Sequence, residues 1–148
     1  MVVGGSTGRP LRHVPAPPHL DTIPGDHQER PMKFLIVLHD PPYGTERTYN
    51  GIRWARQLID ADGNHEVKIF MFADAVAATA DGQKTPNGFY NLAKMLKGFT
   101  EKGGVVGNCG TCMDARAIAD DRLVSGSHRS GMAELAEWTV WADKVINV

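Results

Sequence analysis

Both cysteines of this chain, Cys109 and Cys112, lie in one short stretch with a glycine and a threonine between them. The mostly apolar residues before them predict the end of a buried strand, and a helix is predicted over about residues 112–120. A strand-to-helix turn is where an α/β sheet places its chemistry. Because unpaired N–H groups at a helix N-terminus favour the thiolate over the thiol, we predict that Cys109 is a nucleophile.

The residues around the thiols suit an anionic sulfur. Gly107 and Gly110 allow close approach to the backbone, so that N–H groups of the turn are open to an anion. Arg116 adds a fixed positive charge to the predicted site. Asp114 either opposes the thiolate, if it points at the sulfur, or satisfies helix N–H groups as an acid of the first turn.

Spacing gives the second cysteine a role. Cysteines three residues apart are close enough to form a small disulfide or to pass a sulfur atom, so we predict that Cys112 is a resolving thiol. A C-x-x-C pair is also half of a zinc site, which His39 and His128 are available to complete, and buried cysteines are often inert. We favour sulfur or redox chemistry, because there is no second C-x-x-C pair and both cysteines fall in one glycine-flanked turn.

Length and composition argue for one globular domain. A chain of 148 residues is long enough for one well-formed core and too short for two comfortable ones. The net charge of −1 and the 22% of charged residues give no reason to expect a nucleic-acid or membrane partner. The sequence shows neither an apolar run that would span a bilayer nor a secretory signal, so we expect a cytoplasmic protein. In that compartment a disulfide would be transient and functional.

Residues 1–31 differ from the rest of the chain, because they hold six of the nine prolines and no sustained apolar periodicity. We predict a disordered leader or an upstream extension over 1–31, and a folded domain over 32–148. The alternative is an arm that docks on a neighbouring molecule.

After residue 31, apolar runs typical of buried parallel strands alternate with helical patterns. Further helices are predicted to begin at the caps Thr45, Asn87 and Ser130, and residues 125–129 are predicted to form a polar loop. Such alternation implies right-handed crossovers, so we predict an α/β fold, a three-layer α/β/α sandwich around a mainly parallel sheet. The predicted strands are 33–39, 67–72, 105–108, 123–124 and 144–148.

Loops that follow parallel strands share one edge of the sheet. Tyr43, Asp74 and Lys84 follow the first and second strands, so we expect them to lie toward Cys109. His39, at the end of its strand, is a candidate proton shuttle, although a histidine in such a position is more often only hydrogen-bonded.

Four groups of residues together resemble the DsrE-like sulfur-relay family, and within it the YchN-like branch. They are spread over residues 32–148 and are far more specific in combination than a C-x-x-C pair. The groups are Pro42-Tyr43-Gly44-Thr45-Glu46; Asp74-Ala75-Val76 with Gly82-Gln83-Lys84; Cys109, Thr111, Cys112, Asp114, Arg116 and Ile118 of the cysteine turn; and Leu135-Ala136, Trp138-Thr139 and Ala142-Asp143-Lys144-Val145.

The resemblance implies a five-stranded α/β/α domain that assembles into homo-oligomers, either trimers or hexamers. In the relay members a cysteine after the third strand carries sulfur as a persulfide, and this position falls on Cys109. Cys112 is an addition typical of the YchN-like branch, and Ala117 stands where the family usually has glycine. Trp138 and Trp141 on the last helix suit either a subunit interface or packing on the protein's own sheet.

We therefore expect a cytoplasmic sulfur-handling protein in which Cys109 accepts sulfane sulfur from a donor protein or a small persulfide, and Cys112 resolves it or passes it on. Such a carrier or transferase needs no cofactor and no metal. One alternative is a thiol/disulfide oxidoreductase, and another is a non-catalytic oligomeric binding protein whose thiols are incidental or hold a metal between subunits. The residues expected to support the thiols are Tyr43, Asp74, Lys84, Gly110, Thr111, Asp114 and Arg116.

Overall fold

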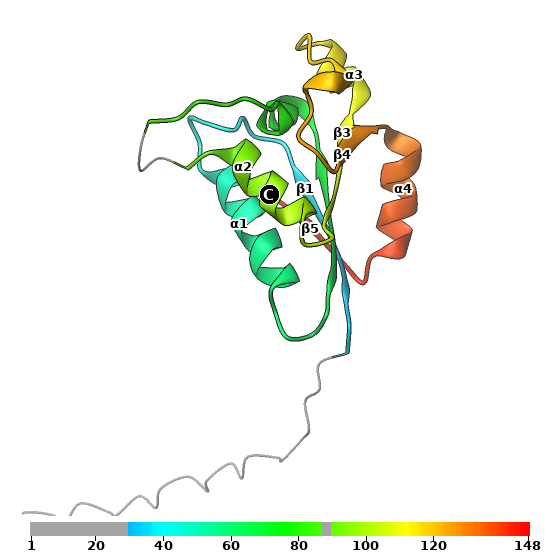
Figure 1. The fold of residues 1–148 in the computed structure, drawn as a ribbon. Coiled ribbons are helices and arrows are strands. Elements are labelled where there is room, and N and C mark those ends of the chain that lie inside the picture. The colour runs from blue at the N-terminus through cyan, green and yellow to red at the C-terminus, as the bar shows by residue number, and fades with distance from the viewer. Residues whose placement is uncertain (1–29, 87–89) are drawn as a thin grey trace, which may run out of the picture.

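The computed structural model describes residues 30–86 and 90–148. Five strands form one parallel sheet in the order β4-β3-β2-β1-β5 (Figure 1). The strands are β1 (Lys33–Leu38), β2 (Glu66–Met71), β3 (Val105–Cys109), β4 (Ser127–Ser130) and β5 (Lys144–Asn147). The helices are α1 (Arg47–Ile59), α2 (Leu92–Thr100), α3 (Gly110–Asp114) and α4 (Met132–Trp141), together with the 3-10 helices η1 (Ala73–Thr79) and η2 (Asp120–Arg122).

Helices cover both faces of the sheet. α1 and α2 lie against one face and α4 lies against the other (Figure 1). This arrangement confirms the predicted α/β/α sandwich around a parallel sheet of five strands. The thiols lie at the carboxyl end of β3, which is next to the edge strand β4.

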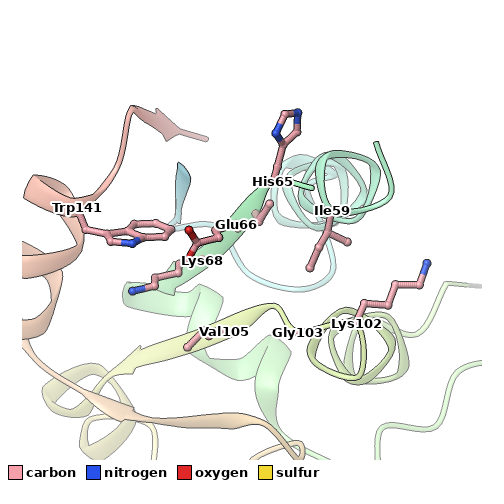
Figure 2. Close-up of a pocket in the computed structure, with 9 residues that line it drawn as sticks. Ile59, His65, Glu66, Lys68, Lys102, Gly103, Val105 and Trp141 are labelled. Carbon is pink, nitrogen blue, oxygen red and sulfur yellow. The ribbon is translucent and has the colours of Figure 1, made fainter. Parts of the chain in front are cut away.

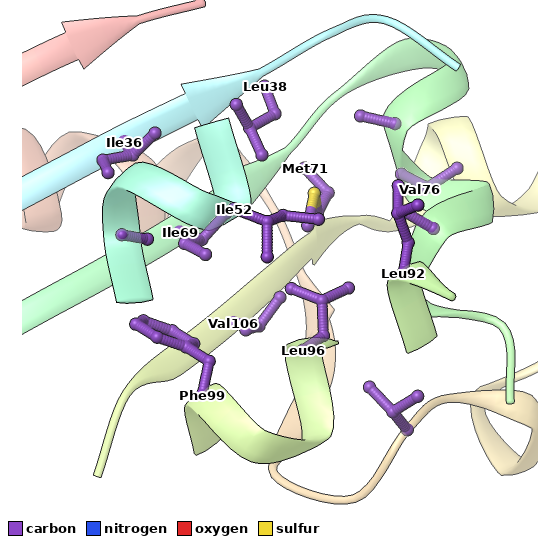
Figure 3. Packing of buried hydrophobic residues seen from close by; sticks show 14 of the residues in the cluster. Ile36, Leu38, Ile52, Ile69, Met71, Val76, Leu92, Leu96, Phe99 and Val106 are labelled. Carbon is purple, nitrogen blue, oxygen red and sulfur yellow. The ribbon is translucent and has the colours of Figure 1, made fainter. Parts of the chain in front are cut away.

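The central strands are apolar because both of their faces are covered. Ile36 of β1 enters the cluster under α1 and α2, whereas Leu35 and Val37 enter the cluster under α4. This alternation follows from the period of two along a strand. Figure 3 shows the larger cluster, in which the helical residues Ile52, Leu96 and Phe99 pack against the strands.

Two helices begin differently from the prediction. α1 has no side-chain cap, because the predicted cap Thr45 donates its hydroxyl to the Asp40 carboxylate at 2.9 Å instead. α2 is capped by Asn91, whose side-chain oxygen accepts the N–H of Lys94 at 3.0 Å. The cap predicted for that helix, Asn87, lies outside the described residues.

The fourth strand lies where a loop over residues 125–129 is predicted. β4 pairs with β3 so that Ser130 lies opposite Cys109. An edge strand has only one neighbour to pair with and keeps much of its surface in water, so its polar sequence gives no apolar run from which to predict it.

The segments on either side of β4 also differ from the prediction. Leu123, predicted to lie in a strand, forms only an isolated antiparallel bridge with Ala80. α4 begins after Gly131, so Ser130 belongs to the strand and does not cap the helix. Both differences follow from the position of β4, because this strand occupies residues Ser127–Ser130, between Leu123 and the start of α4.

The prediction of a leader over 1–31 falls almost entirely on residues 1–29, which lie outside the described part of the chain. Within the residues that the structure describes, no helix is both long enough and apolar enough to cross a bilayer.

Candidate thiol site

Cys109 is the last residue of β3 and the residue immediately before α3. α3 therefore begins earlier than predicted and contains Cys112 in its only full turn, whereas the predicted helix over 112–120 is wrong beyond its first residues. The helix ends because Ala117 adopts a left-handed conformation with φ 52°. The N–H of Ile118 then turns back to the carbonyl of Met113 at 3.0 Å, as in a Schellman-type end.

The two thiols differ in their exposure. Cys109 is 9% exposed and belongs to the apolar cluster under α4, together with Phe70 and Trp138. Cys112 is half-buried and packs against the clusters on both faces of the sheet. Cys112 is thus the more accessible of the two sulfur atoms.

Within residues 30–86 and 90–148, one backbone N–H donates to a cysteine sulfur, and it comes from η1. The Ala73 N–H donates to the Sγ of Cys112 at 3.2 Å. Ala73 has φ 44°, a left-handed conformation that costs a residue other than glycine about 1–2 kcal/mol. This differs from the prediction, which assigned the sulfur contacts to the helix amides and to Cys109; the Cys109 side chain makes no capping bond to α3.

The Cys109 thiol affects the titration of Cys112. Burial and the neighbouring Cys109 side chain raise the pKa of Cys112 above its ordinary value, while the Ala73 N–H and the charge of Arg116 oppose the shift. Cys112 therefore holds its proton to higher pH than an ordinary thiol.

An ion pair joins η1 to the cysteine turn. The Arg116 guanidinium donates from Nε and Nη2 to Oδ1 of Asp74, at 2.8 and 2.6 Å. Its Nη1 donates to the Cys112 carbonyl at 2.9 Å. Two of the predicted supporting residues, Asp74 and Arg116, therefore lie at the thiols and connect the two segments that meet there.

A second arginine holds the other side of the turn. Arg129 of β4 pairs with Asp114 at 3.0 Å and with Asp120 at 2.7 Å, and it donates to the Gly110 carbonyl at 3.1 Å. A Cβ at Gly110 would lie 2.9 Å from the Arg129 guanidinium, so a larger residue here would require that side chain to shift. The Asp114 carboxylate is bound to this arginine, and Thr111 lies exposed on the turn.

The remaining predicted residues lie elsewhere. Tyr43 and Lys84 line a cavity of about 350 Å³ together with Thr85, Pro86 and Tyr90. Among the described residues, neither Tyr43 nor Lys84 forms a hydrogen bond or an ion pair with a cysteine. The Tyr43 hydroxyl instead donates to the Gln83 side chain at 2.7 Å.

The two histidines considered as metal ligands are hydrogen-bonded. His39 Nε2 lies 2.9 Å from Oδ1 of Asn147, and His128 Nε2 lies 2.8 Å from a carboxylate oxygen of Glu134. Over residues 30–86 and 90–148, no group of three or more His, Cys, Asp or Glu side chains is arranged to hold a metal ion.

Two polar groups near the thiols escaped the sequence analysis. Asn108 is fully buried and accepts the Thr79 hydroxyl at 2.8 Å, which fixes η1 to β3. Glu134 accepts hydrogen bonds from Ser130 and His128, which fixes α4 to β4. A polar residue inside an apolar strand was the available signal for Asn108, whereas nothing local marks Glu134.

A smaller cavity, of about 120 Å³, lies at the opposite edge of the sheet from the thiols. Figure 2 shows its lining at the amino-terminal ends of β2 and β3, with Lys68 beside Trp141. The Lys68 ammonium lies 4.0 Å from the centre of the Trp141 ring, a cation–π contact that joins α4 to the sheet. This cavity is therefore separate from the thiol site.

The fold and the cysteine turn together define a family. The model of the DsrE/DsrF-like family matches residues 32–148, so this chain belongs to that family. The relatives include protein YchN of Escherichia coli strain K12, which is 39% identical over 115 residues, covering 78% of this chain and 97% of that protein. The uncharacterized protein MK0008 of Methanopyrus kandleri is 33% identical over 114 residues, covering 76% of this chain and 91% of that protein.

Solved structures agree with this assignment. The crystal structure of the ychN protein from E. coli aligns with a TM-score of 0.74 and 38% identity, over 79% of this chain and 99% of that one. The protein of unknown function MTH1491 from Methanobacterium thermoautotrophicum aligns with a TM-score of 0.62 over 80% of this chain and 99% of that one, but at 14% identity it shares only the fold. The resemblance to the DsrE-like family and its YchN-like branch is confirmed.

Proposed function

We propose that this chain is a cytoplasmic sulfur carrier in which Cys109 accepts sulfane sulfur as a persulfide and Cys112 is the second thiol of the relay. The observation that carries the proposal is a pair of free cysteines, three residues apart, at the carboxyl edge of a parallel sheet in a chain of the DsrE/DsrF-like family. The cytoplasm suits the proposal because its thiols stay reduced.

The first step is a thiol exchange on sulfur. The Cys109 thiolate attacks the outer sulfur of a donor persulfide, R–S–SH, and the donor leaves as the thiolate R–S⁻. One S–S bond forms on Cys109 while one breaks in the donor, so no external oxidant is needed. Cys112 holds its proton during this step, because burial and the neighbouring Cys109 side chain raise its pKa.

The burial of Cys109 suits a carrier. At 9% exposure, its sulfur is shielded by the cluster under α4, which limits the access of water and of stray thiols to a bound persulfide. Access from outside comes through the turn that holds the half-buried Cys112. The donor is therefore proposed to be a protein or a small persulfide that reaches the site through this turn.

We also propose that the chain forms a homo-oligomer, a trimer or a hexamer. Support comes from large apolar side chains exposed on the α4 side of the sheet, where Val140 is 88% exposed, Met132 65% and Val145 49%. Trp138 is buried against the protein's own sheet, so it is not available to such an interface. Light scattering after size exclusion measures the assembly, and a monomer would contradict this part of the proposal.

Intact mass after loading tests the carrier function. The reduced protein is incubated with inorganic polysulfide and desalted, and its intact mass is measured by mass spectrometry. The Cys109→Ser and Cys112→Ser variants are treated in parallel. We expect Cys112→Ser to gain one sulfur atom and Cys109→Ser to gain none. No added sulfur in Cys112→Ser would overturn the proposal.

The three-residue spacing of the two free thiols also favours a second candidate, a thiol/disulfide oxidoreductase. In that case, the wild type loses two hydrogens and forms the Cys109–Cys112 disulfide, and Cys112→Ser carries no extra sulfur. The single-cysteine variant therefore separates the two functions, because only a carrier holds sulfane sulfur without the second thiol.

A further inference from the structure

We propose that Cys112 is the exit sulfur of the relay, and that the Ala73 N–H, held in place by the Asp74–Arg116 ion pair, binds the sulfur that Cys112 carries. This inference rests on the proposed function, which leaves open whether Cys112 passes sulfur on or releases it as sulfide. Three features of the structure support transfer through Cys112.

The first feature is exposure. Cys109 is buried under α4, whereas Cys112 is half-buried on the turn that faces outward. An acceptor reaches Cys112 without opening the cluster around Cys109. Sulfur that moves from Cys109 to Cys112 therefore moves from a protected site to an accessible one.

The second feature is a hydrogen-bond donor aimed at one sulfur only. The backbone nitrogen of Ala73 lies 3.2 Å from Sγ of Cys112, and Ala73 itself has a left-handed backbone with φ 44°. A strained residue persists only where the surrounding structure holds it, and such residues cluster at functional sites. Within the described residues, this N–H is the one backbone donor recorded to a cysteine sulfur.

The third feature is what holds that donor. Asp74 follows Ala73 directly, and its carboxylate accepts two bonds from Arg116, which also binds the Cys112 carbonyl. The Arg116 guanidinium therefore connects Asp74, which follows the donor residue Ala73, to the backbone of Cys112, whose sulfur accepts the hydrogen bond. Asp74 and Arg116 are positioning residues in this arrangement, because they act through Ala73.

The proposed step conserves atoms and charge. The Cys112 sulfur attacks the outer sulfur of the Cys109 persulfide, Cys109–S–SH, while its proton passes to the leaving Cys109 sulfur, and this gives Cys112–S–SH and the Cys109 thiol. One S–S bond forms on Cys112 as the one on Cys109 breaks, with no net oxidation. The competing attack, on the inner sulfur, would give the disulfide and HS⁻ and end the relay.

Mapping the carried sulfur tests the inference. Polysulfide-loaded protein is alkylated, digested and fragmented between the two cysteines. In the wild type we expect the alkylated persulfide mainly on Cys112, and in Cys112→Ser on Cys109. A wild type that carries its sulfur on Cys109, or that forms only the disulfide, would overturn the inference while the loading of Cys112→Ser still upheld the carrier function.

Delivery is measured with cyanide, which removes sulfane sulfur as thiocyanate. We expect Asp74→Asn to load as much sulfur as the wild type, to hold less of it on Cys112, and to release it about tenfold more slowly. Asp74→Glu keeps a carboxylate and should recover part of the rate. The matched control is Asp120→Asn, which removes an equally exposed carboxylate paired with Arg129, and it should match the wild type.

Two results would contradict the role of the ion pair. Either Asp74→Asn shows the wild-type distribution of sulfur and the wild-type rate, or Asp120→Asn slows release as much as Asp74→Asn does. If no variant that retains Cys109 loads sulfur, the carrier function fails, and this inference fails with it.

Discussion

The two faces of the sheet are built differently. Under α1 and α2 lies a large cluster whose members, such as Ile52, Leu96 and Phe99, are fully buried (Figure 3). Under α4 lies a small cluster around Phe70, Cys109 and Trp138. One face thus supplies most of the buried apolar surface, whereas the other holds Cys109 beneath a single helix.

This difference predicts that the two faces contribute unequally to the stability of the protein. Burial of apolar surface is the main favourable contribution to folding, so the face under α1 and α2 should dominate the free energy of unfolding. The smaller cluster under α4 holds Cys109, the proposed sulfur acceptor. Cys112 packs against both clusters and therefore lies at the boundary between the two faces.

The largest effect is expected on the two-helix face. Phe99→Ala removes a fully buried ring and leaves a cavity, so we expect the free energy of unfolding to fall by about 3–5 kcal/mol. Denaturant titration measures this, and Phe99→Leu, which fills most of the space, should cost only about 1.5 kcal/mol. The alkylation rate of Cys109 in the folded protein should not change. Faster alkylation of Cys109 in folded Phe99→Ala would mean that the two faces are not independent.

A smaller but more local effect is expected under α4. Trp138→Leu should cost roughly 2 kcal/mol, because Trp138 is 5% exposed and packs edge-on against Phe70. Since Cys109 lies in the same cluster, its alkylation in a Cys112→Ser background should accelerate several-fold under native conditions. An unchanged rate would show that α4 does not control access to Cys109.

The sequence was most informative where both faces of a strand are buried. β1, β2 and β3 lie within one residue of the predicted runs, because apolar strands and the glycine and proline breaks between them are local signals. β4 was not predictable, because an edge strand of serine, histidine and arginine is specified by its pairing with β3. α3 ends early for a reason that composition does not show, the left-handed backbone of Ala117.

The site divides in the same way. The cysteine turn and its strand-to-helix setting follow from local sequence, and so does the choice of Asp74 and Arg116 as nearby residues. The donor at Ala73 does not, because its contact with Cys112 joins residues 39 positions apart. Tyr43 and Lys84 lie on the predicted loops but line a separate cavity, because sharing an edge of a sheet does not fix which neighbours a side chain meets.

Strain near the thiols gives the third prediction. Ala117 adopts φ 52°, where a residue with a Cβ pays about 1–2 kcal/mol that glycine avoids. Glycine loses more backbone entropy on folding, by about 0.5–1 kcal/mol, so Ala117→Gly should stabilise the protein by about 0.5–1 kcal/mol. Thermal and denaturant unfolding measure it, with Ala115→Gly as the control, because Ala115 has helical φ and ψ and should lose stability. A destabilised Ala117→Gly would mean that the strain is relieved elsewhere.

The smallest effect concerns the link between α4 and the edge of the sheet. Burial tends to raise the pKa of Glu134, but the hydrogen bonds from Ser130 and His128 outweigh it and lower the pKa below its ordinary value of 4.5. A carboxylate with a lowered folded-state pKa stabilises the protein above its ordinary value, and this contribution is lost as the pH falls through the folded-state value. We therefore expect Glu134→Gln to cost about 0.5 kcal/mol near neutral pH and progressively less below pH 4.5, until the two proteins converge. Unfolding free energies measured across this range, beside Glu137→Gln on the same helix, test it. If the difference in unfolding free energy between the wild type and Glu134→Gln did not depend on pH, Glu134 would act by packing. The charge of Glu134 would then not contribute to the attachment of α4 to β4.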